Sequence, residues 1–155
     1  MNEQHLRRAV ELARLGMRAG RGGPFGAVVV RDGEVIGEGC NEVTSTPDPT
    51  AHAEVVAIRA AARRLGRFWL DDCEIYASCE PCPMCLGAVM WSRIPRVWYA
   101  AGRADAAAAG FSDQHLYDVF EGRVSNTGVA LRQHLREEAS AVFEEWRRNP
   151  GFRRY

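Results

Sequence analysis

The side chains best suited to chemistry lie in two short segments of this 155-residue chain. The first is His52-Ala53-Glu54, and the second, Cys79-Glu80-Pro81-Cys82-Pro83-Met84-Cys85, begins 25 residues after Glu54. Imidazole and thiolate groups are preferred zinc ligands, and a catalytic zinc site keeps one tetrahedral position open for water. His52, Cys82 and Cys85 supply three such ligands. The pattern therefore predicts one Zn²⁺ per chain that activates a water molecule.

Glu54 follows the predicted histidine ligand by two residues and is predicted to move the proton. An activated water needs a group that takes its proton and returns it to the leaving group. Residues two apart do not share a face in the middle of a helix, so His52 and Glu54 reach one site only near a helix start. Asp48 suits the N-cap and Pro49 the first helical position, which predicts a helix over about 49–65.

The two cysteine ligands are predicted to lie on a second helix, over about 81–91. Cys82 and Cys85 are three residues apart and so would share one helix face. Pro81 suits the first helical position, and the partial positive charge at a helix N-terminus favours the thiolate that binds zinc.

Cys79 leaves two alternatives open. A closed structural zinc site would use three cysteines together with His52. An iron–sulfur cluster would need a fourth thiolate, which Cys40 or Cys73 could supply without any supporting spacing. The open, catalytic site is the interpretation that also gives Glu54 a role.

The composition limits the partners and the compartment. Twenty basic and twenty acidic residues give a net charge of zero, which argues against nucleic acid as a partner. The N-terminus has no apolar signal-peptide core, and no apolar run approaches the roughly 20 residues of a membrane span. Five cysteines at metal-ligand spacing fit a reducing compartment. We therefore expect a cytoplasmic protein that makes no membrane contact.

The alternation of helix and strand signals predicts the fold class. The expected elements are a helix near 6–17, hairpin strands at 27–30 and 34–37 around Asp32-Gly33, the two helices above, strands at 73–79 and 97–101, short helices near 104–109 and 114–120, and a longer helix ending the stretch 129–148. A hairpin followed by helix-linked parallel strands predicts a three-layer α/β/α fold with a mixed sheet. No linker divides the chain, so residues 1–155 are predicted to form a single domain.

Beyond these two segments, the chain resembles the cytidine-deaminase-like superfamily and, within it, the small bacterial guanine deaminases. The resemblance covers nearly the whole chain and includes the segments 22–30, 48–54, 79–88 and 109–113 and the tail from Trp146 to Tyr155. It implies that His52, Cys82 and Cys85 ligate zinc and that Glu54 shuttles the proton in hydrolytic deamination.

The same resemblance implies a set of substrate-binding residues. Asn41 would hydrogen-bond a purine base, Phe25 would contact the base, and Trp91 would form part of the pocket wall. Asp113 matches the second carboxylate of a Gly-Phe-Asp-Asp motif and would assist with substrate or proton transfer. The first carboxylate of that motif is Ser112 here, a departure that bears on substrate selectivity.

The resemblance also implies a homodimer. The family exchanges its C-terminal segment, here about 130–155, between two subunits, so that Tyr155 would close the partner's active site. The aromatic side chains Phe143, Trp146, Phe152 and Tyr155 must be buried somewhere. Packing of this tail onto its own domain is the alternative.

Three functions follow from these observations. The first, implied by the resemblance, is deamination of guanine to xanthine and ammonia in purine catabolism or salvage. The second keeps the chemistry but changes the substrate to tRNA adenosine, cytosine, guanosine or ammeline. The third is a zinc-stabilised binding domain without turnover, in which Glu54 would be dispensable and Cys79 would complete the metal shell.

Overall fold

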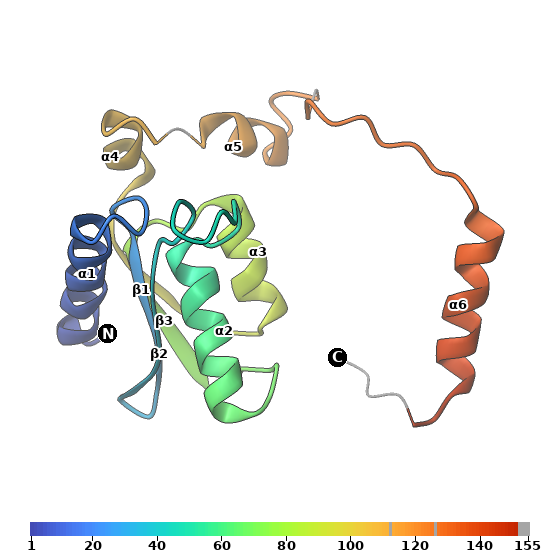
Figure 1. Cartoon of the computed structure of the whole chain (residues 1–155), viewed down its shortest axis with the longest axis horizontal. Coiled ribbons are helices and arrows are strands. Elements are labelled where there is room, and N and C mark those ends of the chain that lie inside the picture. Colours follow the sequence, from blue (N-terminus) through green and yellow to red (C-terminus); the bar gives the residue numbers. More distant parts are fainter. Residues whose placement is uncertain (112, 126, 152–155) are drawn as a thin grey trace.

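A four-stranded mixed sheet forms the centre of the protein (Figure 1). The computed structural model describes residues 1–111, 113–125 and 127–151. The strands are β1 (Gly26–Arg31), β2 (Glu34–Cys40), β3 (Cys73–Cys79) and β4 (Val97–Ala101), in the order β2-β1-β3-β4. β1 pairs antiparallel with β2 and β3, and β3 pairs in parallel with β4. The predicted mixed sheet is therefore confirmed.

Helices cover both faces of this sheet and complete the predicted three layers. α1 (Glu3–Arg18) lies on one face, and α2 (Ala53–Leu65) and α3 (Pro83–Trp91) lie on the other (Figure 1). Two short helices, α4 (Arg103–Ala108) and α5 (Gln114–Phe120), lie at the end of the sheet where β3 and β4 end. The site described below lies at this same end.

The hairpin and the central strand follow directly from local sequence. Asp32 and Gly33 have φ angles of 50° and 82°, the left-handed conformations that a two-residue hairpin turn requires. Val28 and Val30 pack towards α1, whereas Ala27 and Val29 pack towards α2. Because β1 is buried on both faces, its sequence is a continuous apolar run rather than an alternating one.

Two glycines of β2 allow α2 to lie directly against the sheet. A Cβ atom at Gly39 would lie 2.4 Å from the carbonyl oxygen of Ala53, and one at Gly37 would lie 2.4 Å from that of Ala57. A side chain at either position would therefore push the helix away. The contact at Gly39 holds the first turn of α2, which carries Glu54.

The starts of both site helices were predicted too early. α2 begins at Ala53, and His52 is its N-cap in an extended conformation. Asp48 does not cap the helix, because its Oδ1 accepts hydrogen bonds from the backbone and side chain of Thr50 in a separate turn. α3 likewise begins at Pro83 rather than Pro81, and its N-cap is Cys82.

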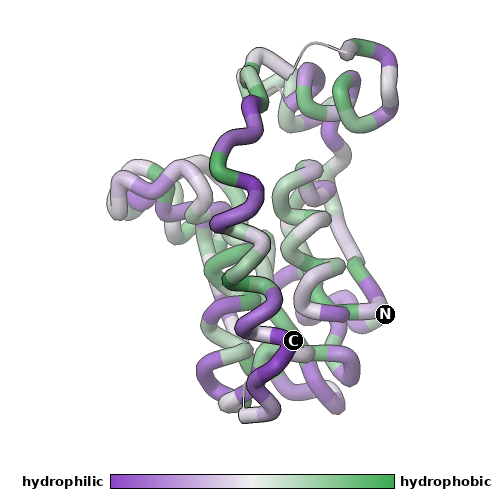
Figure 2. Tube along the Cα trace, turned by 90° about the vertical axis from the view of Figure 1, so that its right-hand side faces the viewer, coloured by the Kyte–Doolittle hydropathy of each residue, from purple (hydrophilic) through white to green (hydrophobic). Residues whose placement is uncertain are grey.

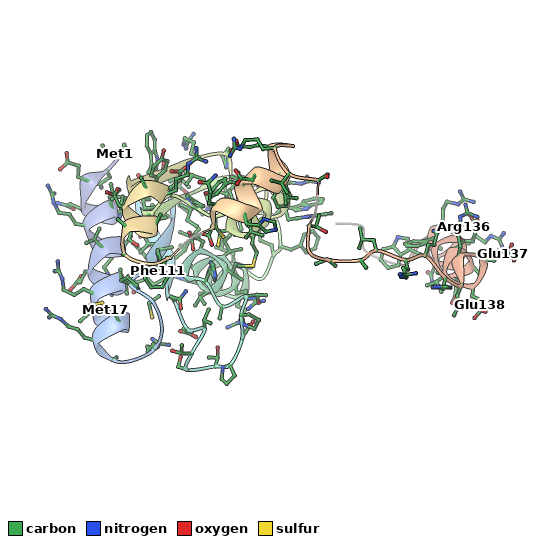
Figure 3. All side chains as sticks on the ribbon, turned by 90° about the horizontal axis from the view of Figure 1, so that it is seen from above. Met1, Met17, Phe111, Arg136, Glu137 and Glu138 are labelled. Atoms are coloured by element: carbon green, nitrogen blue, oxygen red, sulfur yellow. The ribbon has the colours of Figure 1, made fainter. Side chains whose placement is uncertain are left out.

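The C-terminal segment leaves the rest of the chain. An extended stretch leads to α6 (Arg136–Arg148), which stands apart from the sheet in Figure 1. Figure 3 shows Arg136, Glu137 and Glu138 far from the helices around the sheet. Along α6 hydrophilic and hydrophobic residues alternate (Figure 2), and Val142 and Phe143 are 65% and 74% exposed. α6 therefore presents apolar side chains that the rest of the described chain leaves exposed.

Candidate functional site

The predicted metal ligands lie together where two helices begin. His52 precedes α2, and Cys82 and Cys85 lie at the start of α3. One ligand atom from each of the three lies within 4.8 Å of the other two. Nδ1 of His52 is 3.7 Å from Sγ of Cys82 and 3.5 Å from Sγ of Cys85. The sequence motif and the family resemblance predicted these ligands, and the extended N-cap conformations of His52 and Cys82 lie where the three side chains meet.

The donor atoms of this cluster suit a metal cation. A hydrogen bond from Cys85, together with the neighbouring His52, lowers the pKa of Cys82. The hydrogen bond to Cys82 and burial raise the pKa of Cys85. The Cys82 thiolate in turn raises the pKa of His52. One nitrogen and two sulfur donors with a ready thiolate form a set that fits zinc and leaves a fourth position for a non-protein ligand.

Cys79 lies outside this ligand group. Its Sγ donates to the carbonyl oxygen of Gly102 at 3.7 Å, and burial raises the pKa of its thiol. Among the described residues, His52, Cys82 and Cys85 are the His, Cys, Asp and Glu side chains that gather closely enough to hold a metal. The structure therefore favours the open site over a closed site with three cysteines.

Glu54 is buried beside the ligand cluster. It is 7% exposed, and its Oε2 accepts a hydrogen bond from Sγ of Cys85 at 3.4 Å. Burial raises the pKa of this carboxyl group. Burial favours the protonated form more than solvent does, so this carboxyl group can serve as both a proton acceptor and a proton donor. Its position in the first turn of α2 follows from the contact of that turn with Gly39.

A cavity of about 430 Å³ opens next to the cluster. His52, Glu54 and Cys82 line it, and so do Asn41, Phe25 and Asp113. This volume lies within the range of small-molecule sites. Three predicted metal or proton-transfer residues and three predicted substrate residues thus face one space.

Asn41 has a defined orientation in the cavity wall. The side chain is buried, and its Oδ1 accepts hydrogen bonds from the backbone N–H groups of Gly23 and Val43, both at 3.2 Å. These two donors identify the amide oxygen, so the NH₂ group remains as a donor for a ligand. A Cβ atom at Gly22 would lie 2.1 Å from the same oxygen, so glycine at this position leaves room for it.

An aromatic pair and a carboxylate form another part of the cavity wall. The rings of Phe25 and Phe111 meet edge to face with centroids 5.0 Å apart. Phe111 lies between α4 and α5 above the sheet (Figure 3). Asp113 is the N-cap residue of α5, and burial raises its pKa.

One predicted substrate-binding residue, Trp91, lies away from the cavity within its own chain. It is 77% exposed at the far end of α3, where it contributes to a separate surface groove. α3 carries it away from the helix start that holds the ligands, and its place in the pocket wall stays a prediction. Tyr155 and Ser112 lie outside the described residues.

The sequence analysis did not identify every cavity residue. Arg103 of α4 and Tyr117 of α5 are two that it missed, and both line the cavity. Burial raises the pKa of Tyr117 to about 12. Neither belongs to a recognisable motif, so no sequence signal identified them.

Comparison with known proteins agrees with the site geometry. The family model of the cytidine and deoxycytidylate deaminase zinc-binding region matches residues 1–101. A guanine deaminase from Bacillus subtilis is 51% identical over 146 residues, which cover 94% of each chain. A tRNA-specific adenosine deaminase from Aquifex aeolicus is 37% identical over 79% of each chain. An X-ray structure of guanine deaminase from Bacillus subtilis superposes with a TM-score of 0.92, covering 100% of this chain and 99% of that one at 50% identity.

Proposed function

Because the chain belongs to the family of the cytidine and deoxycytidylate deaminase zinc-binding region, we propose that it hydrolyses guanine to xanthine and ammonia. The observation that carries this proposal is its similarity over nearly the full length to a Bacillus subtilis guanine deaminase. The local geometry supports the reaction type, since two of the three clustered metal ligands, His52 and Cys82, and the buried carboxyl group of Glu54 line one cavity.

The proposed proton path runs through Glu54. Zn²⁺ held by His52, Cys82 and Cys85 supplies the Lewis acidity that lowers the pKa of water. As water adds to C2 of the base, Oε2 of Glu54 takes its proton and returns it to the adjacent ring nitrogen. Glu54 then carries the proton of the new C2 hydroxyl to the exocyclic amine, the bond from C2 to that amine breaks, and ammonia leaves as the C2 carbonyl forms. The burial of this carboxyl group, which raises its pKa, suits both directions of transfer.

The remaining walls are proposed to select the base. The NH₂ group of Asn41 would donate to an acceptor atom of the purine, since its oxygen is occupied by Gly23 and Val43. Phe25 would contact the ring, and Asp113 would assist with binding or proton transfer. A flat aromatic base with several acceptors matches this combination of an aromatic wall and an oriented donor.

We also propose that the chain forms one deaminase domain whose C-terminal part, about 130–155, packs on a second subunit. α6 lies wholly within the described residues and contains no buried side chain. Leu86, Met90 and Trp91 leave a second exposed apolar surface on α3. Two uncovered apolar faces in one chain support an exchange of α6 between two copies. Tyr155 would then close the partner's cavity.

A cytoplasmic location in purine metabolism completes the proposal. All five cysteines lie among the described residues as free thiols, which fits a reducing compartment. Among the described residues, no helix has the length and apolar character needed to cross a membrane.

The test is ammonia release by the zinc-loaded protein from guanine, guanosine, adenine, cytosine, ammeline and adenosine in tRNA. We expect a strong preference for guanine, and activity on another amine alone would show that the substrate is wrong. Glu54→Gln should keep its zinc but lose at least about 100-fold in kcat. Glu74→Gln, which changes a half-buried carboxyl group away from the cavity, serves as the matched control. Full activity of Glu54→Gln would refute the proton path.

A further inference from the structure

α5 covers the cavity but has little to hold it there. It is seven residues long, and none of its residues, all of which the structure describes, is buried. An isolated helix of this length is unstable in water, so its position depends on a few tertiary contacts. One of them reaches the zinc-ligand loop: Oη of Tyr117 donates to the carbonyl oxygen of Pro81 at 3.0 Å. Pro81 directly precedes the predicted ligand Cys82.

Arg103 supports Tyr117 from α4. Its guanidinium carbon lies 4.8 Å from the centre of the Tyr117 ring, a cation–π contact. Its Nη1 is 3.4 Å from Oε1 of Glu121, just after α5, and its backbone N–H donates to Oε2 of Glu80 at 3.2 Å. The tyrosine is thus held between the ligand loop and α4.

The same helix turn connects this contact to Asp113. The carbonyl oxygen of Asp113 accepts from the backbone N–H of Tyr117 at 3.2 Å. Both side chains line the cavity, together with Cys82. Movement of Tyr117 away from Pro81 would therefore also move the Asp113 carboxylate relative to the ligand loop.

We propose that Tyr117 is a positioning residue, whose hydrogen bond to the Pro81 carbonyl latches α5 onto the zinc-ligand loop and holds Asp113 in place for the reaction. The proposal rests on the proposed deaminase function, because Asp113 receives its role there. Tyr117 acts through Asp113 and needs no contact with the substrate. Only the hydroxyl group of Tyr117 makes the hydrogen bond to Pro81. Tyr117→Phe therefore removes this hydrogen bond and keeps the ring that stacks with Arg103.

The test compares Tyr117→Phe with Tyr76→Phe in the zinc-loaded protein. Tyr76 is a suitable control because its hydroxyl also donates a hydrogen bond, to Glu74 at 2.9 Å, but on the face of the sheet that packs against α1. We expect Tyr117→Phe to lower kcat for guanine about three- to tenfold, the effect of one lost hydrogen bond, with zinc content unchanged. Tyr76→Phe should keep the wild-type kcat.

Two further measurements separate positioning from general destabilisation. In an Asp113→Asn background, Tyr117→Phe should cause no additional loss of kcat, because the two residues act as one unit. Independently of any activity, amide hydrogen exchange of residues 113–120 should be faster in Tyr117→Phe than in Tyr76→Phe or the wild type. This second readout stands even if guanine is not the substrate.

Three results would overturn the proposal. Unchanged amide hydrogen exchange of residues 113–120 in Tyr117→Phe would show that the Tyr117 hydroxyl does not hold α5 in place. Multiplicative losses in the double variant would show that Tyr117 does not act through Asp113. Loss of zinc from Tyr117→Phe would show that it positions Cys82 instead.

Discussion

Substitution of Gly39 by alanine should displace the site residues at the start of α2 relative to those of α3. A Cβ atom there would lie 2.4 Å from the carbonyl oxygen of Ala53 and 2.7 Å from the backbone nitrogen of Ala57. Ordinary contact begins at 3.4 Å, so the first turn of α2 must move by about 1 Å, the difference between 3.4 and 2.4 Å. The obstructing atoms are backbone and cannot rotate away. His52 and Glu54 would move with this turn, whereas Cys82 and Cys85 remain on α3.

The expected magnitudes follow from this displacement. Overpacking of this kind costs about 1–3 kcal/mol of the free energy of unfolding. A misplacement of about 1 Å can cost on the order of 100-fold in rate, and metal–ligand distances tolerate only about 0.2 Å. We therefore expect Gly39→Ala to bind zinc more weakly and to lose about 100-fold in kcat/KM for guanine.

Gly37→Ala is the matched control. Its Cβ atom would lie at the same 2.4 Å from a helix carbonyl oxygen, that of Ala57, but further along α2 from His52. We expect a similar loss of stability in urea unfolding, with at least a tenfold smaller loss of kcat/KM. The assay measures zinc content, unfolding and ammonia release for both variants. Equal activity losses in the two variants, or wild-type activity in Gly39→Ala, would refute the reasoning.

Other substitutions test the ligand set, the ion pairs and the C-terminal segment. Elemental analysis should find one zinc per chain in Cys79→Ser and none in Cys82→Ser. Zinc loss from Cys79→Ser would instead favour the closed site with three cysteines. Hydrogen bonds from Arg8 lower the pKa of Glu38 below 4.5, so their contribution to stability is present above pH 4.5 and is lost as the pH falls through the folded value. The free energy of unfolding of Glu38→Gln, measured in urea, should therefore depend less on pH below 4.5 than that of the wild type. The difference should be at most about 1 kcal/mol, because solvent screens this half-exposed pair. An unchanged pH dependence would contradict this. Phe143→Ser should shift the mass measured by light scattering from twice 17.2 kDa towards 17.2 kDa, and a wild-type monomer would contradict the exchange of α6.

Local patterns predicted most of the secondary structure. Asp32 and Gly33 identified the hairpin because a two-residue turn needs backbone conformations that few residue types adopt readily. The strand Cys73–Cys79 and the helix Gln114–Phe120 were predicted with their observed bounds. Helix starts were less predictable, since the side chain of Asp48 is equally suited to a cap or to a turn and bonds Thr50 in a turn.

The metal ligands and the proton carrier could be predicted from the sequence because they lie in two short segments. His52 and Glu54 are two residues apart, and Cys82 and Cys85 are three apart, so each pair is positioned by a single helix start. The types and spacing of these residues, which match the motif of a known family, predicted the metal, its open position and the proton carrier. The resemblance also implied the substrate-binding side chains.

Only the tertiary structure decided which other residues share this space. It separated Cys79 from the ligand group, placed Trp91 in a separate surface groove and brought Tyr117 to Pro81, 36 residues earlier in the chain. Such contacts depend on how α2 and α3 pack on the sheet and on how α4 and α5 lie across its end. They join residues far apart in the chain, and packing determines them without any fixed spacing that a sequence pattern could reveal.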